Sequence, residues 1–180
     1  MTWIDRFVQT RRIKMAARYL PKHPRVLDVG CADGALFRVL PFLRDGVGID
    51  PEMSPVSTGN AQLIRGMFPQ DLPHDGPFDA ITMLAVLEHI PKERQPILAH
   101  DCFRYLRSSG RLIITVPSPQ TDYILNVLRA LRLIDGMSLE QHYGYDVNLT
   151  PQLFESAGFK LLVARKFQLG LNNLFVFEKP

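Results

Sequence analysis

Two kinds of segment alternate along the chain. Short and almost continuously apolar runs are typical of strands that are buried on both faces of a sheet. We expect such strands at Arg25 to Gly30, Val47 to Asp50, Leu63 to Arg65, Phe78 to Leu84 and Leu112 to Val116. Segments with apolar residues on one helical face lie between them, and we expect helices at Ala35 to Leu43 and Gln95 to Arg107. This alternation predicts βαβ units and a mainly parallel sheet, an α/β fold.

The last third of the chain has a different pattern. Residues 119–148 include an apolar helical stretch and a polar, aromatic segment, and we interpret them as a cap or substrate region over the sheet. Thr150 and Pro151 are typical of a helix start and Gly158 of a helix end. Phe159 to Phe167 and Leu171 to Phe177 then predict a closing antiparallel pair.

Length and composition favour one domain. The chain has 180 residues, 46% of them hydrophobic, and contains no internal repeat or charged linker. We therefore expect a single domain over residues 1–180. The longest apolar stretch, Ala80 to Leu87, is too short to cross a bilayer as a helix. Cys31 and Cys102 form no metal-type spacing, and we expect both to be thiols of a cytoplasmic protein.

The net charge of +3 is unevenly distributed. Seven basic residues and one acidic residue give the first 25 residues a charge of +6, which leaves −3 for the remainder. Contact with nucleic acid or another anionic surface is one interpretation. Apolar residues also recur at helical spacing within residues 1–23, so the arginines would then lie on the solvent face of a docked N-terminal helix. We favour the second interpretation.

The clearest candidate for a ligand site is the turn after the first strand. In the segment VLDVGCADG, an apolar strand ends in small residues that open a helix. A side chain at Gly30 or Gly34 would obstruct a ligand or the packing of the helix. The second strand ends in Asp50, a carboxylate that can accept from both hydroxyls of a ribose. Nicotinamide dinucleotide dehydrogenases share this arrangement, so these residues alone do not select the cofactor.

A wider pattern resembles the class I S-adenosylmethionine (SAM) dependent methyltransferases. The segments VLDVGCADG, GVGID, PFDAITMLAVLEHIP, RSSGRLIITVPSP and LTPQLFESAGF occur in the order and at the distances found in that family. The resemblance is greatest to its small-molecule methyltransferases, including quinone-pathway O-methyltransferases. It implies a Rossmann-like, doubly wound sheet of seven strands in the order 3-2-1-4-5-7-6, with strand 7 antiparallel. SAM would lie across the carboxyl ends of strands 1 and 2.

The resemblance also implies the residues that hold SAM. Asp50 would bind the ribose, Met67 and Phe68 the adenine, and Leu84 and Ala85 would lie beneath the cofactor. The methionine part would be wrapped by residues of the first turn: Asp28, Gly30, Cys31, Ala32 and Gly34. Two positions depart from the family pattern. Ala32 stands where the family usually has glycine, and Gly66 where it commonly has an aspartate, so Asp71 is an alternative contact for adenine.

Three side chains are candidates for catalysis. We expect Glu88 and His89 after the fourth predicted strand and His142 in the cap, with His142 as general base because imidazole titrates near neutral pH. Residues 85–89 resemble a Glu-x-x-Glu-His metal-binding stretch of some methyltransferases. Because Ala85 replaces its first glutamate, the remaining ligands are few and we expect no metal.

The sequence therefore predicts methyl transfer from SAM to a small molecule, at oxygen. Two alternatives remain open. Methylation of a nucleic acid or protein is supported by the basic N-terminal segment. A non-catalytic SAM-binding module is supported by Ala32, by Met67 and by the short second helical segment.

Overall fold

A seven-stranded sheet forms the centre of the molecule in a computed structural model, which describes residues 3–43, 45–53, 59–73, 76–118 and 145–180. Its strands are β1 (Val26–Val29), β2 (Gly46–Asp50), β3 (Ala61–Arg65), β4 (Phe78–Leu84), β5 (Leu106–Pro117), β6 (Lys160–Phe167) and β7 (Asn172–Glu178). They lie in the order β3-β2-β1-β4-β5-β7-β6. β1 to β5 are parallel, and β7 is antiparallel to β5 and β6. The predicted fold class and strand order are confirmed.

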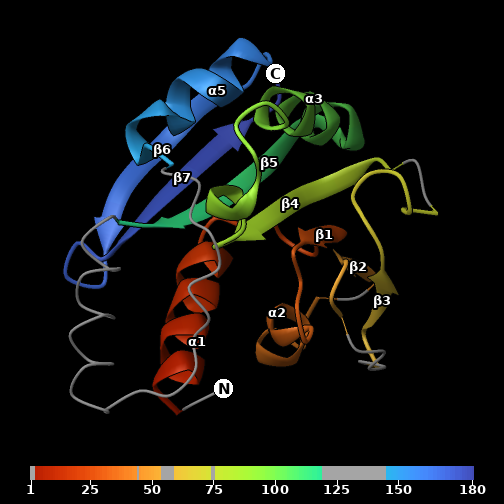
Figure 1. Ribbon diagram of the computed structural model, residues 1–180. Helices are drawn as coiled ribbons and strands as arrows, with labels where there is room; N and C mark the ends of the chain where they lie inside the picture. The colour runs from red at the N-terminus through yellow and green to blue at the C-terminus, as the bar shows by residue number, and fades with distance from the viewer. Residues whose placement is uncertain (1–2, 44, 54–58, 74–75, 119–144) are drawn as a thin grey trace.

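Helices cover both faces of the sheet (Figure 1). On one face lie α1 (Trp3–Ala17) and α2 (Ala35–Val39), and on the other lie α3 (Gln95–Tyr105) and α5 (Thr150–Ser156). Neighbouring residues of β5 show why both faces are apolar: Ile113 packs toward Ala16 of α1, whereas Ile114 belongs to the cluster that contains Phe154 of α5. Burial on both faces explains the continuous apolar runs of the strands.

Several predicted boundaries were wrong. The helix expected from Ala35 to Leu43 ends at Val39, although Leu40 and Leu43 remain buried. The N-terminal helix, expected over residues 1–23, ends at Ala17 among the described residues, and the third strand begins at Ala61 instead of Leu63. These ends depend on tertiary contacts that the hydrophobic pattern does not encode.

The largest difference is at the start of β5. The helix expected to reach Arg107 ends at Tyr105, and the strand expected from Leu112 begins at Leu106. Ser109 N–H donates to Lys179 O, and Lys179 N–H donates to Gly110 O, at 2.7 and 3.0 Å. The polar segment thus joins the sheet because it pairs with the end of the chain, 70 residues away in sequence.

Among the described residues, no helix is long and apolar enough to cross a membrane. The proposed cap lies almost entirely outside the described residues, which resume at Tyr145 and continue through the short helix η2 (Val147–Leu149) into α5. The division into one domain with an N-terminal helix and a cap stays a prediction. The described residues do include the edge of the sheet at which β1, β2 and β4 end.

Candidate functional site

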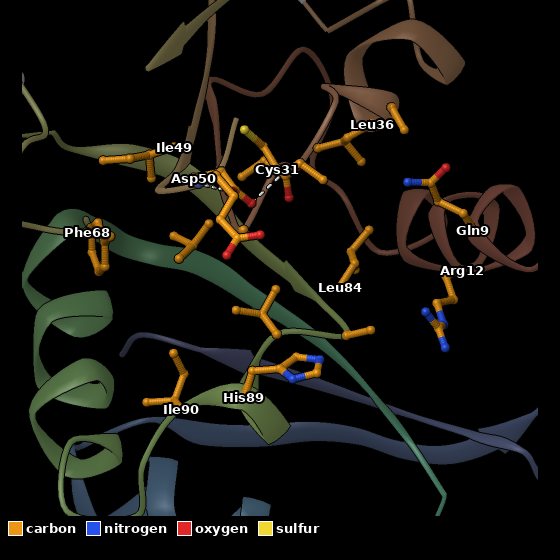
Figure 2. Close-up of a pocket in the computed structure, with 18 of the residues that line it drawn as sticks. Gln9, Arg12, Cys31, Leu36, Ile49, Asp50, Phe68, Leu84, His89 and Ile90 are labelled. Atoms are coloured by element: carbon orange, nitrogen blue, oxygen red, sulfur yellow. Dashed lines mark hydrogen bonds between the residues drawn. The ribbon is translucent and has the colours of Figure 1, made fainter. Parts of the chain in front are cut away.

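A cavity of about 1250 Å³ opens at the carboxyl ends of β1, β2 and β4. Residues from α1, from the start of α3 and from the turn between β6 and β7 complete its wall. Nine of the ten predicted cofactor-binding residues line it: Asp28, Gly30, Cys31, Ala32, Asp50, Met67, Phe68, Leu84 and Ala85. Gly34 does not line it. Figure 2 shows Phe68 and Arg12 at opposite ends of the cavity, with Leu84 and His89 between them.

The turn between β1 and α2 has an unusual backbone. Gly30, Ala32 and Gly34 all have positive φ angles, of 75°, 46° and 70°. Glycine adopts this region readily, whereas alanine adopts it at a cost. A side chain at Gly30 would come within 2.3 Å of Val86 Cγ2, in the loop after β4. The packing of these two loops therefore requires a glycine at position 30. The absence of a side chain there also leaves room for a ligand in the cavity.

Asp50 is held in a fixed orientation at the end of β2. Its Oδ2 accepts from Ala32 N–H at 2.9 Å, and its Oδ1 accepts from Glu52 N–H at 2.8 Å. The half-buried carboxylate lines the cavity, and each oxygen has capacity for a further hydrogen bond. This geometry suits two adjacent hydroxyl donors.

The loop after β3 forms an apolar end of the cavity. Met67 is 46% exposed, and the Phe68 ring packs edge-on against the Tyr105 ring with a centroid distance of 5.3 Å. Asp71 does not line the cavity, and its Oδ2 accepts from Met67 N–H at 2.8 Å. In this structure the Asp71 carboxylate stabilises the loop backbone, and the cavity there is lined by the side chains of residues 67–70.

Asp28 is a buried carboxyl group at the end of β1. The pKa of Asp28 is raised to about 7, mainly by burial; the hydrogen bond from Thr82 opposes this rise, and the nearby Asp50 carboxylate adds to it. Thr82 Oγ1 donates to Asp28 Oδ1 at 2.6 Å. A carboxyl group that titrates near neutrality and lines a cavity responds strongly to a cation bound beside it. Burial also raises the pKa of the neighbouring Cys31 thiol, which makes it a poor nucleophile.

Arg12 is the residue that the sequence analysis missed. It projects from α1 into the wall of the cavity, and its Nε donates to Asn172 Oδ1 at 2.9 Å. Asn172 in turn donates through Nδ2 to Gln168 Oε1 at 2.6 Å. Burial lowers the pKa of Arg12, and the negative charge of Glu88 partly offsets that shift. The surface that this enclosed guanidinium retains faces the cavity.

One signal could have identified Arg12. It precedes the fully buried Ala16 by four residues, which places both on the same face of α1. The interpretation that we favoured from the sequence placed the arginines of this segment on the solvent face. Arg12 lies instead on the docked face.

The two predicted catalytic residues in η1 (Leu87–His89) have different surroundings. His89 lines the cavity, whereas Glu88 is 3% exposed and does not line it. Their side chains approach each other, with 3.9 Å between His89 Nε2 and Glu88 Oε1. This arrangement suits Glu88 for orienting its neighbours and His89 for contact with a ligand. His142 lies outside the described residues.

The described part of the chain contains no group of three His, Cys, Asp or Glu residues arranged to hold a metal ion.

Comparisons with known proteins agree with this geometry. A model of the methyltransferase domain matches residues 2–163. A probable SAM-dependent methyltransferase of Mycolicibacterium smegmatis is 27% identical over 158 residues, covering 78% of this chain and 59% of that protein. A ubiquinone biosynthesis O-methyltransferase of Dechloromonas aromatica is 30% identical over 140 residues, covering 71% of this chain and 55% of that protein. The chain thus spans less than two thirds of the length of these relatives.

The fold has close counterparts among solved structures. Magnesium protoporphyrin IX methyltransferase from Synechocystis PCC 6803, solved with bound S-adenosylhomocysteine (SAH), superposes with a TM-score of 0.69. The alignment covers 100% of this chain and 88% of that one at 16% sequence identity. At this identity the likeness concerns the fold.

Proposed function

The chain belongs to the class I SAM-dependent methyltransferase family, and from that premise we propose that it binds SAM in the cavity and methylates a hydroxyl group of a small molecule. The observation that carries the proposal is the Asp50 carboxylate, fixed by two backbone N–H groups at the end of β2 and directed into a large cavity. The position suits the ribose of a nucleoside cofactor.

The residues around the cavity fit the other groups of SAM. An apolar site at Met67 and Phe68 matches adenine, and the Arg12 guanidinium matches the carboxylate of the methionine part. Asp28 matches positive charge, and the ammonium and sulfonium groups of SAM both carry it. The apolar residues Met67 and Phe68 at one end of the cavity and the Arg12 cation at the other favour one orientation of the ligand, with the nucleoside toward Phe68 and the amino acid toward Arg12.

SAM supplies a methyl group on a sulfonium, which is already an activated leaving group. The main task of the protein is then to hold an acceptor in line with that group and to exclude water. A pocket for one drug-sized ligand has a volume of about 300 to 1000 Å³. The cavity of about 1250 Å³ is larger, which supports an acceptor bound beside the cofactor.

His89 is our candidate for contact with the acceptor. It faces the cavity between the Phe68 and Arg12 ends (Figure 2), and the buried Glu88 carboxylate lies 3.9 Å from its Nε2. A histidine in this position can accept the proton of a hydroxyl acceptor. His142 remains a second candidate for the base. Oxygen as the acceptor atom is supported by the O-methyltransferases among the relatives.

The test of cofactor binding is calorimetric titration with SAM, SAH and NAD. We expect SAM and SAH to bind and NAD not to bind. Binding of NAD alone would assign the chain to a different class of enzyme, and absence of binding by all three would contradict the proposal.

The test of the base is a comparison of two variants in a methyl-transfer assay, with the acceptor taken from a screen of phenols and catechols. We expect His89→Gln to lower kcat by roughly 100-fold or more, with the Kd for SAM unchanged. His142→Gln is the parallel variant. If only that variant lowers kcat, His142 is the base and His89 is not.

A further inference from the structure

The outward face of α1 carries both aromatic and basic side chains. Trp3 is 77% exposed and Phe7 is 59% exposed, and the exposed Arg11 and Lys14 follow them on the same side of the helix. Spacings of four, four and three residues align the four side chains in one stripe. The Arg11 guanidinium lies over the Phe7 ring, 5.9 Å from its centroid. A helix that is fully hydrated on this side gains nothing from two exposed aromatic rings.

The turn between β6 and β7 continues this surface. Leu169 at its tip is fully exposed, and the turn is tied to α1 because Gln168 Nε2 donates to Val8 O at 3.3 Å. Gln168 and Leu169 have positive φ angles of 51° and 56°, which non-glycine residues adopt at a cost. The backbone is therefore strained where it presents a leucine to solvent.

This surface borders the mouth of the cavity. Phe7, Arg11 and Leu169 all line the cavity as well as contributing to the exposed face. Whatever binds the outward face of α1 thus lies beside the opening through which a ligand enters.

Charge and chemistry together favour one class of partner. The cations Arg11 and Lys14 lie on this face, within a segment of 25 residues that carries +6 while the remainder carries −3, so the surface attracts an anionic partner. Tryptophan, phenylalanine and leucine beside cations are typical of segments that lie in the interface of an anionic bilayer. Transfer of a fully exposed leucine from water to acyl chains is favourable, whereas a leucine cannot stack on a nucleic-acid base as an aromatic ring can.

We propose that the outward face of α1, with Leu169, binds the surface of an anionic lipid bilayer and turns the mouth of the cavity toward it. The binding is peripheral: the aromatic and aliphatic side chains enter the interface, and Arg11 and Lys14 contact lipid headgroups. The proposal does not depend on methyl transfer, since its measurements involve neither SAM nor an acceptor.

The first experiment uses the wild-type protein. Trp3 is the only tryptophan of the chain, so its fluorescence reports directly on this face. On adding vesicles of phosphatidylcholine with phosphatidylglycerol, we expect a blue shift of the emission, quenching by brominated lipid, and affinity at least tenfold above that for phosphatidylcholine alone. Raising NaCl from about 0.1 to 0.5 M should weaken binding. An unchanged spectrum would overturn the proposal, as would binding with Trp3 still in water.

Two double variants separate the apolar from the basic contribution, measured by co-sedimentation with vesicles. We expect Trp3→Ser/Leu169→Ser and Arg11→Gln/Lys14→Gln each to weaken binding by roughly tenfold or more. The matched controls are Phe42→Ser, an exposed phenylalanine after α2, and Lys160→Gln/Lys166→Gln, two exposed cations on β6. Equal losses in the controls would overturn the proposal, because binding would not be specific to this face.

The same variants test the other partners. A single-stranded RNA that binds more tightly than the vesicles and competes with them would identify a nucleic-acid surface instead. Self-association in sedimentation velocity that the α1 variants abolish, without vesicle binding, would identify a contact between copies of this chain. Thermal unfolding of each variant checks that the fold is intact.

Discussion

The two ends of the cavity are assembled in different ways. At the nucleoside end, Asp50 is held by backbone N–H groups of Ala32 and Glu52, both within 18 residues in sequence. At the other end, Arg12 is held by Asn172, 160 residues away. The first end is built from neighbouring βα turns of one half of the sheet. The second forms only when α1 docks beside the start of β7.

This difference predicts how each end of the cavity responds to amino-acid substitution. Backbone donors persist through most substitutions, so the nucleoside end depends mainly on Asp50 itself. The Arg12 end depends on a chain of side chains, each of which can be altered. A ligand that contains only the nucleoside part of SAM distinguishes the two ends, and methylthioadenosine is such a ligand because it lacks the amino-acid group.

The largest effect is expected at Asp50. Asp50→Ala removes both acceptors for the ribose hydroxyls, and we expect the Kd to rise by roughly 100-fold or more for both SAM and methylthioadenosine. Calorimetric titration measures both. Asp50→Asn retains one oxygen acceptor, so its Kd for both ligands should rise less than that of Asp50→Ala. If Asp50→Ala binds SAM as tightly as the wild type does, Asp50 does not contact the cofactor.

Arg12 should affect only one of these ligands. We expect Arg12→Gln to raise the Kd for SAM by roughly 10- to 100-fold, since it loses a charged hydrogen bond to the carboxylate, and to leave the Kd for methylthioadenosine unchanged. Arg18→Gln, an exposed arginine just after α1, is the matched control. Equal weakening of both ligands would show that Arg12 supports the fold of the site rather than the amino-acid group.

Asp28 should make SAM binding depend on pH. Its pKa of about 7 leaves the carboxyl neutral in acid, while a bound cation favours the ionised form. The affinity for SAM should therefore rise with pH and level off above about 7, with a slope approaching tenfold per pH unit on the acid side. Asp28→Asn should flatten the profile. Methylthioadenosine, which has no positive charge, should bind equally across the range; an identical slope for both ligands would contradict this role.

The smallest effect is expected at Ala32, the position where the family usually has glycine. Its φ of 46° is one that glycine adopts without strain. We expect Ala32→Gly to raise the free energy of unfolding by up to about 1 kcal/mol in urea denaturation. Ala35→Gly, in the first turn of α2, should lower it by about 0.5 to 1 kcal/mol. Destabilisation by Ala32→Gly would mean that the turn is not strained.

Much of the nucleoside end could be predicted from the sequence because its signals are local. An apolar run followed by Gly30, and a second run ending in Asp50, indicate strand ends at one edge of a sheet whatever the rest of the chain does. Gly30 and Asp50 line the cavity for this reason, whereas Met67, Phe68, Leu84 and Ala85, which also line it, were expected only from the family resemblance. The length of β5 could not be predicted in this way, since its polar start joins the sheet by pairing beside the end of β7.

Arg11 and Arg12 show the limit of the sequence most clearly. They are neighbours of the same type, and each residue turns a helix by about 100°. Arg11 is exposed beside Phe7, whereas Arg12 is enclosed and hydrogen-bonded to Asn172. The sequence alone determined which segments form the five parallel strands, though not where β3 and β5 begin, and it determined the glycine turn and the acidic residue at the end of β2, because each follows from local pattern. Only the tertiary structure decided which arginine is enclosed and which is exposed, because that depends on which side of α1 packs against the sheet.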